Sequence, residues 1–496
     1  MTVNPAESIS TFYSGQSILL TGATGFLGKV FFEKVLRSCP DVREIFLLMR
    51  PNRESNINER LKKILNLPLY EKLCKEQSSN FEKLVPIFGD VSEKGLGLSA
   101  ADRQMLVKRV TIIIHAAGDV KFSNSLKYAI FANTRSTRDV CILAKDMKNL
   151  IALVYVSTAY TNVDKEFIEE KVYSPVADWQ KMIQMAESLD EHILNIFSAK
   201  CLDYIPNTYI FSKNLAESII QDYSSYLPCA IVRPSIVTST LIDPFPGWID
   251  NVYGPIGLFI AGGKGIIKVG YCDKYVRENV VPVDIVIKTI LTASWKVGLN
   301  TTSFTANSTP FVINCVSQKH ITYQEGIKLL FSVLKEVPLE GIVWTPHTML
   351  TNNFVLFYIL TILWHILPAI LIDLILKFSG RQPMLIKLQR KVYVLNCALC
   401  YFSLHEWKFG QKNYFSLLSS IPTNNRNTFS FDSSYFDVRE YAINCTMGAK
   451  RHILHEDLNQ LDAVKARNKR ICLLVTVLKT FISIGMLLII YKWIYS

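Results

Sequence analysis

The sequence predicts an α/β fold built on a doubly wound parallel sheet, with a smaller second domain and a mainly helical C-terminal region. Three observations predict it: short apolar runs alternate with segments of helical periodicity, a glycine-rich turn follows the first run, and a Tyr-x-x-x-Lys pair lies far downstream. At 496 residues the chain is too long for one ordinary hydrophobic core, so we expect two or more domains.

The first apolar run, residues 17–20, predicts a buried parallel strand. The turn at 21–28 follows directly, and apolar positions at helical spacing continue to Leu36. Strand, glycine turn and helix together predict a Rossmann cradle that holds a dinucleotide pyrophosphate on backbone N–H groups. The spacing is G-x-x-G-x-x-G, a variant found in short-chain dehydrogenases. The predicted cofactor-binding residues in this turn are Gly22, Thr24, Gly25, Phe26, Leu27 and Gly28.

The second predicted strand, residues 45–49, ends at Arg50, and Arg53 follows shortly after. An acidic residue at this strand end accepts hydrogen bonds from the ribose of NAD, whereas an arginine suits the 2′-phosphate of NADP. The two arginines therefore predict NADPH as the cofactor. The alternative is that both are solvated surface charges.

The third and fourth predicted strands continue the nucleotide-binding half of the sheet. Residues 84–90 form a strand that reaches Asp90, which with Val91 is predicted to lie beside the adenine. The next strand, at 111–118, contains His115, which we interpret as a packed strand-end histidine rather than a catalytic one. Asn133 lies where a helix could present a polar side chain to the cofactor region.

The fifth predicted strand, residues 151–156, runs into Ser157 and Thr158. Ligands of open parallel sheets gather at the carboxyl ends of the strands, so these hydroxyls are predicted to bond a substrate carbonyl. Tyr209 and Lys213 share one helix face at i and i+4. We expect the Lys213 ammonium to favour the Tyr209 phenolate and lower its pKa, and Lys213 also to bind the nicotinamide ribose.

The sixth predicted strand, residues 232–237, places Pro234 and Ile236 near the nicotinamide. Segments 247–251, 254–257 and 281–284 suggest the smaller substrate domain, and 311–316 reads as one more strand. The segment beginning Thr322-Tyr323-Gln324-Glu325 has the capping-box pattern of a helix N-terminus.

Taken together, these motifs resemble the fatty acyl-CoA reductases that form alcohols, within the extended short-chain dehydrogenase/reductase superfamily. The resemblance rests on TGATGFLGKV, FLLMRP, VYVSTAYTN, PNTYIFSKNLAE, VRPSIV and GWIDNVYGP, and it covers essentially the whole chain. It implies reduction of a long-chain fatty acyl-CoA by two NADPH to a primary alcohol, with release of CoA and a retained aldehyde. Ala23 and the segment 118–120 depart mildly from the family pattern.

The net charge of +12 points to a partner, and we expect membrane lipid rather than nucleic acid. Residues 377–470 hold fifteen Lys/Arg against seven Asp/Glu, between two apolar stretches. The last stretch, 471–491, is long enough to span a bilayer and follows Arg467, Lys469 and Arg470, so it predicts a tail anchor with the catalytic domain in the cytosol. We favour the endoplasmic reticulum over the peroxisome.

The earlier apolar stretch, 354–376, contains His365, Pro368 and Asp373. A true span here would carry the basic block across the membrane, so we favour an interfacial or re-entrant hairpin broken at Pro368 over a transmembrane helix. The predicted domains are therefore a reductase domain with its substrate-binding part at 1–340, the membrane-associated segment at 354–376, a basic helical domain at 377–466 and the anchor at 471–491.

Two other functions share parts of this pattern. A membrane-bound 3β-hydroxysteroid dehydrogenase would have the same glycine turn, Tyr/Lys pair and apolar tail. A non-catalytic dinucleotide sensor would share the cradle, but such proteins commonly lack the Tyr/Lys pair. Eleven scattered cysteines suggest a reducing compartment, and a single C-x-x-C at 397–400 gives no reason to expect a metal site. Acyl-chain preference and homo-oligomer formation are left open by the sequence.

Overall fold

The computed structural model describes residues 6, 8–51, 55–300 and 308–495. The chain forms two compact units, and each is assembled from three segments. The first unit comprises Met1–Phe245, Asn279–Gln318 and Trp407–Tyr435, and the second comprises Pro246–Glu278, Lys319–Glu406 and Phe436–Ser496. Segments of the two units therefore alternate along the sequence, whereas the predicted domains, with boundaries at 340 and 377, are each one continuous stretch of chain.

The first unit is built on a seven-stranded parallel sheet in the order β12-β7-β5-β4-β1-β2-β3. The order turns back between β1 and β4, as in a doubly wound sheet, and the carboxyl ends of these two strands mark the switch point where ligands bind. The strands are β1 (Ser17–Thr21), β2 (Glu44–Met49), β3 (Leu84–Phe88), β4 (Ile112–His115), β5 (Ala152–Val156), β7 (Cys229–Pro234) and β12 (Phe311–Cys315).

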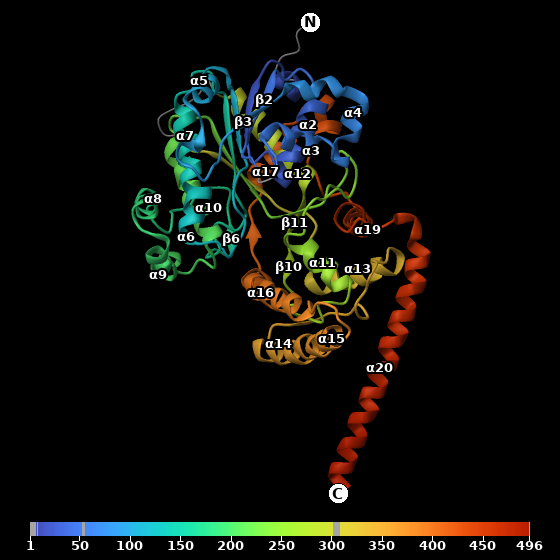
Figure 1. Ribbon diagram of the computed structural model, residues 1–496. Coiled ribbons are helices and arrows are strands. Elements are labelled where there is room, and N and C mark those ends of the chain that lie inside the picture. The colour runs from blue at the N-terminus through green and yellow to red at the C-terminus, as the bar shows by residue number, and fades with distance from the viewer. Residues whose placement is uncertain (1–5, 7, 52–54, 301–307, 496) are drawn as a thin grey trace. The chain divides into compact units, whose positions relative to one another are not determined.

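Helices cover both faces of this sheet. Every residue of β1, β2, β4 and β5 is buried, which is typical of parallel strands covered on both sides. On one face α2 (Phe26–Ser38) packs against α12 (Val283–Leu299), and on the other α7 (Ser136–Lys145) packs against α10 (Thr208–Tyr223) (Figure 1). The predicted α/β fold with a doubly wound parallel sheet is confirmed.

The sixth predicted strand differs from the structure in its bounds. The observed strand, β7, begins at Cys229 and ends at Pro234. One residue later β8 (Ile236–Thr238) begins, and it pairs with β11 (Val280–Pro282) in a separate two-stranded sheet. Proline has no N–H to continue the ladder, which accounts for the break at Pro234. The predicted capping box is confirmed: Thr322 and Glu325 cap α13 (Tyr323–Glu336) reciprocally.

A segment of the predicted C-terminal region completes the first unit. β15 (Lys408–Phe409) pairs with β6 (Phe167–Ile168), and α17 (Lys412–Ser419) packs on β12 at the edge of the large sheet. The Glu170 carboxylate accepts hydrogen bonds from the N–H groups of Asn413, Tyr414 and Asn314. The three contacts join residues that are 144 to 244 positions apart, so no local pattern could reveal them.

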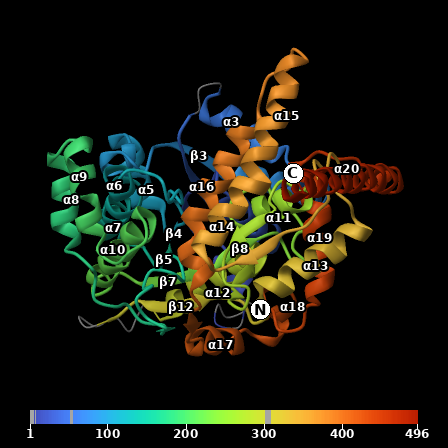
Figure 2. The ribbon, with the colours of Figure 1, turned by 90° about the horizontal axis from the view of Figure 1, so that it is seen from below.

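The second unit holds a long apolar helix that sequence patterning placed only approximately. α14 (Phe354–Thr361), a π-turn at Ile362–Ile366 and α15 (Leu367–Phe378) form one helix of 25 residues (Figure 2). The hairpin predicted to break at Pro368 was wrong. Proline normally clashes with the carbonyl four residues earlier, and the π-turn directly before Pro368 is where the helix adjusts to it.

The chain reverses later, between Phe378 and the start of α16 (Leu385–Leu404), which packs beside α15. Within the described residues, Phe354–Phe378 is the one helix long and apolar enough to cross a membrane by length and composition, with a mean hydropathy of 2.4. The terminal α20 (Leu461–Tyr495) is continuously helical across the predicted tail anchor, and that anchor stays a prediction.

Candidate functional site

The glycine turn between β1 and α2 has the geometry of a phosphate cradle. Gly22 has a φ of +77°, and a Cβ there would lie 2.7 Å from the backbone nitrogen of Ala117 at the end of β4. A Cβ on Gly28 would collide with the carbonyl oxygen of Gly22. Gly25 is the N-cap of α2 without any side-chain cap, and Thr24, Phe26 and Leu27 lie in the same turn. The turn therefore presents backbone and the positive end of a helix dipole, which suits a pyrophosphate.

Arg50 lies at the end of β2, as predicted, and pairs with Asp90 after β3, with 3.1 Å between Nη1 and Oδ2. Although burial acts to raise it, hydrogen bonds from Ser92 and the Arg50 guanidinium hold the pKa of Asp90 below its usual value. Arg60 of α3 (Ile57–Leu65) donates to the carbonyl oxygen of Arg50 at 2.7 Å. A second cation thus lies beside Arg50, and no sequence motif singles it out. Arg53 lies outside the described residues, and Val91 follows Asp90 in the half-exposed turn after β3.

The side chains of Tyr209 and Thr158 lie next to each other and interact at the carboxyl end of β5. Burial raises the pKa of Tyr209 to about 12, and the neighbouring Thr158 side chain acts in the opposite direction. The expectation that Lys213 lowers the pKa of Tyr209 is therefore not met. A neutral, firmly held phenolic proton is suited to donation toward an oxyanion rather than to proton abstraction.

Lys213 lies on the same helix, α10, but its ammonium points to the backbone of β5. Its Nζ donates to the carbonyl oxygen of Val156 at 2.8 Å and lies 4.7 Å from the centre of the Tyr155 ring. Burial lowers the pKa of Lys213 to about 7, while Glu217 acts in the opposite direction. Among the described residues the bond to Val156 is the one hydrogen bond of Lys213 Nζ, so its other donors remain for a ribose or a substrate oxygen.

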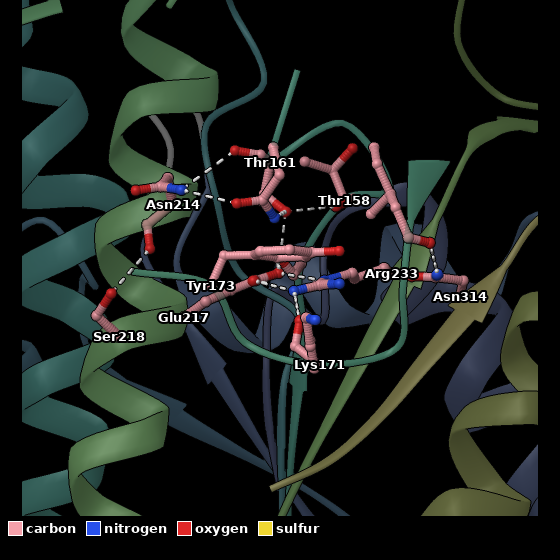
Figure 3. Close-up of polar contacts among 12 residues, drawn as sticks. Thr158, Thr161, Lys171, Tyr173, Asn214, Glu217, Ser218, Arg233 and Asn314 are labelled. Atoms are coloured by element: carbon pink, nitrogen blue, oxygen red, sulfur yellow. Dashed lines mark hydrogen bonds and ion pairs between the residues drawn. The ribbon is translucent and has the colours of Figure 1, made fainter. Parts of the chain in front are cut away.

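Ser157, the other predicted hydroxyl, is hydrogen-bonded to the buried ion pair of Glu217 and Arg233, and Figure 3 shows that pair. Its Oγ donates to Oε1 of Glu217 at 2.6 Å, and Thr161 donates to the same oxygen at 3.3 Å. Glu217 pairs with Arg233, with 2.6 Å between Oε2 and Nη2, and both side chains are essentially inaccessible. Arg233 also donates to the carbonyl oxygens of Glu169 and Lys171. The cluster ties α10, β5, β7 and the 169–171 segment together.

Asn133 connects the loop after β4 to the helix that carries Tyr209. It lies in a π-turn at Ile130–Arg135, a feature found frequently at functional sites. Its Nδ2 donates to Ser212 Oγ at 2.9 Å, and its Oδ1 accepts from the Asp119 N–H at 2.8 Å. A Cβ on Gly118 would lie 3.1 Å from Asn133 Oδ1 and 3.2 Å from Lys213 Nζ. The departure from the family pattern at Gly118 therefore leaves space beside Lys213.

His115 is packed at the end of β4, as interpreted from the sequence. Its ring nitrogens share hydrogen bonds with Thr21 at 2.8 Å and Thr137 at 3.1 Å, and burial lowers the pKa of His115 to about 3. Pro234 ends β7 and Ile236 begins β8, so both lie at the carboxyl end of the sheet. Sequence reasoning missed Glu217 and Arg233; the available signal was a charged residue in an otherwise apolar strand and a carboxylate four residues after Lys213.

Comparison with known proteins gives a consistent picture. Two family models described as male sterility protein match the chain, an NAD-binding one over residues 20–290 and one named Sterile over residues 364–456. Human fatty acyl-CoA reductase 1 is 36% identical over 460 residues, covering 92% of this chain and 88% of that protein. Mouse fatty acyl-CoA reductase 2 is 34% identical over 466 residues, covering 93% and 89%.

Two solved structures show the same fold. The terminal R domain of the myxalamid PKS-NRPS pathway superposes with a TM-score of 0.55 at 19% identity, covering 89% of this chain and 92% of that one. The R domain of a nonribosomal peptide synthetase from Mycobacterium tuberculosis superposes with a TM-score of 0.54 at 17% identity, covering 90% and 96%. At such identities the likeness concerns the fold alone.

Proposed function

Because this chain belongs to the fatty acyl-CoA reductase family, we propose that it reduces a long-chain fatty acyl-CoA to the primary alcohol, with NADPH as reductant. The observation that carries the proposal is the neighbouring position of the Thr158 and Tyr209 hydroxyls at the carboxyl end of β5, on the same sheet edge as the glycine cradle. A proton donor and a dinucleotide cradle at one edge are the two elements a carbonyl reductase requires.

The cradle fits a dinucleotide because a side chain at Gly22 or Gly28 would fill the space where backbone must approach the pyrophosphate. Arg50 and Arg60 would stand beside a 2′-phosphate, and Asp90 and Val91 would lie near the adenine. Pro234, Ile236 and Lys213 would border the nicotinamide and its ribose. The bound cofactor supplies a hydride for each reduction.

In this proposal side chains of the protein stabilise the negative charge on the substrate carbonyl oxygen and supply its proton. Tyr209 holds its proton until negative charge develops on the thioester oxygen, then donates it, while Thr158 supplies a second hydroxyl to the same oxygen. Lys213 stays fixed by Val156 beside this position. The first reduction gives a hemithioacetal, whose collapse breaks the C–S bond and releases CoA as the thiol.

The second reduction converts the resulting aldehyde to the alcohol at the same oxygen site. The balance is one acyl-CoA, two NADPH and two protons in, and one alcohol, one CoA and two NADP⁺ out. The proposal includes retention of the aldehyde between the two steps. If the aldehyde were released, only one NADPH would be oxidised for each CoA formed.

Membrane association is part of the same proposal. The helix α20 covers the predicted tail anchor at 471–491, and residues 465–470 before it carry four cations, which favour the cytosol for that side. A membrane-bound enzyme meets long-chain substrate and product where they partition. We favour the endoplasmic reticulum over the peroxisome for this membrane.

One experiment separates this function from its alternatives. The purified full chain is incubated with NADPH or NADH and with acyl-CoAs of increasing length or a 3β-hydroxysteroid, and alcohol, aldehyde, free CoA and oxidised cofactor are measured separately. We expect two NADPH per CoA and alcohol as the product. One NADPH per CoA with accumulating aldehyde would refute aldehyde retention. Steroid turnover without acyl-CoA turnover would point to a hydroxysteroid dehydrogenase, and cofactor binding without turnover to a sensor.

A further inference from the structure

The long helix of the second unit buries one narrow stripe and exposes the rest. Its buried side chains are spaced every four residues along nearly its whole length: Phe357, Thr361, His365, Ala369 and Asp373. Three members of this stripe are polar: Thr361, His365 and Asp373. His365 and Asp373, which are unusual in so apolar a stretch, therefore lie on the side of the helix that faces protein.

The π-turn at Ile362–Ile366 keeps the stripe straight. In an α-helix of 3.6 residues per turn, steps of four residues drift steadily around the helix. A π-turn holds more residues, so it rotates the following positions back toward the same side. The result is a single face that packs along the protein body from Phe357 to Asp373.

Specific contacts hold this face to the second unit. His365 Nε2 accepts from the N–H groups of Lys268 at 2.8 Å and Val269 at 3.3 Å, which fixes that nitrogen as unprotonated. Asp373 accepts from three N–H groups at the start of α16, those of Met384, Leu385 and Ile386, each at 2.9 Å. At the other end, the Phe357 ring stacks on Tyr271 and Tyr393, with centroids 5.2 and 5.9 Å apart.

The opposite face is apolar and is bordered by positive charge. Val355, Leu371, Ile375 and Phe378 each expose more than 60% of their surface, and Trp364 exposes 43% near the middle of the helix. Between Asp373 and Glu406 the chain has no acidic residue and five basic ones, Lys377, Arg381, Lys387, Arg390 and Lys391. All five are exposed, and none forms an ion pair with a described residue.

We propose that the helix Phe354–Phe378 docks in the plane of a membrane, with its exposed face at the boundary between head groups and acyl chains and the five cations on anionic head groups. A helix of 25 residues is about 37 Å long, so a polar body bound along it would have to enter the hydrocarbon if the helix spanned. The adjacent α16, with Lys387, Arg390 and Lys391 exposed, belongs to that body. In-plane insertion buries only the apolar face.

The proposal rests on the membrane association proposed above and adds to it a second contact besides the predicted tail anchor. Basic side chains beside an apolar face match an anionic bilayer surface better than a neutral protein surface. Such docking would hold the second unit at the depth where the acyl chain of a substrate lies.

Depth-dependent quenching of Trp364 tests the proposal in the full chain. The protein is reconstituted into vesicles of phosphatidylcholine and phosphatidylserine that carry bromine either near the head-group end or near the methyl end of the acyl chains. The Trp364 signal is the difference between the wild type and Trp364→Phe. We expect quenching about twofold stronger by the shallow bromines, since an interfacial helix reaches about 5–10 Å into the boundary. Stronger quenching by the deep bromines would mean a spanning helix, and no quenching would mean a face covered by protein; either overturns the proposal.

A matched pair of variants assigns the quenching to this face. Ile375→Glu should reduce the Trp364 quenching by at least half, whereas Ile196→Glu, at an equally exposed apolar position of α9 (Glu191–Leu202), should leave it unchanged. Equal effects of both variants would overturn the assignment, and circular dichroism checks that each variant is folded. Quenching needs no substrate, so an inactive protein with shallow quenching would contradict the reductase function and leave the docking surface standing.

Discussion

Ser157 and Glu217 are joined by a buried hydrogen bond of 2.6 Å, so the first hydroxyl after β5 is committed to the ion-pair cluster. The second, Thr158, lies beside Tyr209 instead. Sequence alone could not separate the environments of these two hydroxyls. The two neighbours therefore have different expected roles, Ser157 in holding the strand end and Thr158 in binding the reacting oxygen.

Thr158→Ala should lower kcat by about 10²–10³-fold, the usual cost of losing one oxyanion donor. Ser157→Ala should instead lower stability by about 1 kcal/mol, the net value of one hydrogen bond, and leave most of the turnover. Steady-state kinetics and thermal unfolding of both variants check this. A Ser157→Ala enzyme that is stable but inactive would reverse the assignment.

Glu217→Leu should destabilise the protein by about 3–5 kcal/mol, because it leaves the Arg233 guanidinium buried and unpaired. Arg233→Met should destabilise the protein by a similar amount, because it leaves the Glu217 carboxylate buried and unpaired. The double variant removes both charges and should be more stable than either single variant. Apparent Tm values of the three proteins test this, and a double variant with the summed loss of both singles would contradict the pairing.

Arg50→Gln should weaken NADPH binding by about 1.5–3 kcal/mol and leave NADH binding nearly unchanged, since only NADPH carries the 2′-phosphate. Titration of protein fluorescence with each cofactor measures both affinities. Lys63→Gln on the neighbouring helix α3 serves as a control for the loss of one surface charge. Equal affinity of the wild type for NADPH and NADH would refute the role of Arg50.

Lys213→Met should stabilise the protein at low pH more than at high pH. The folded-state pKa of Lys213 is about 7, against 10.5 for the free side chain, so the unfolded state binds more protons between these values. Stability therefore rises with pH across this window, and the cost of burying the charge is largest below pH 7. The Tm difference between variant and wild type, followed from pH 6 to pH 9, should shrink. A constant difference would contradict the lowered pKa.

The sheet and the cradle could be predicted because their signals are local. A short apolar run followed by glycines predicts that β1 is buried and that the backbone turns sharply at Gly22, where φ is +77°. The same holds for the capping box at Thr322, whose partner is three residues away. These features depend on neighbours in the chain, and the pattern of residue types reports them directly.

The features that could not be predicted from the sequence depend on contacts between separate segments of the chain. The Glu217–Arg233 pair, the β15–β6 pairing and the Asp373 contacts that place the helix reversal after Phe378 join separate segments. The pKa of Tyr209 was expected to fall because only Lys213 was visible in its motif. In the structure burial dominates, and Lys213 is held by Val156.

The most direct test of the central claim, that Tyr209 supplies the proton for acyl-CoA reduction, is the turnover of Tyr209→Phe with NADPH and a long-chain acyl-CoA. The variant loses only the hydroxyl, so NADPH affinity should match the wild type while kcat falls by about 10²–10⁴-fold, the usual cost of a lost general acid. Normal NADPH binding together with near wild-type alcohol formation would contradict the account.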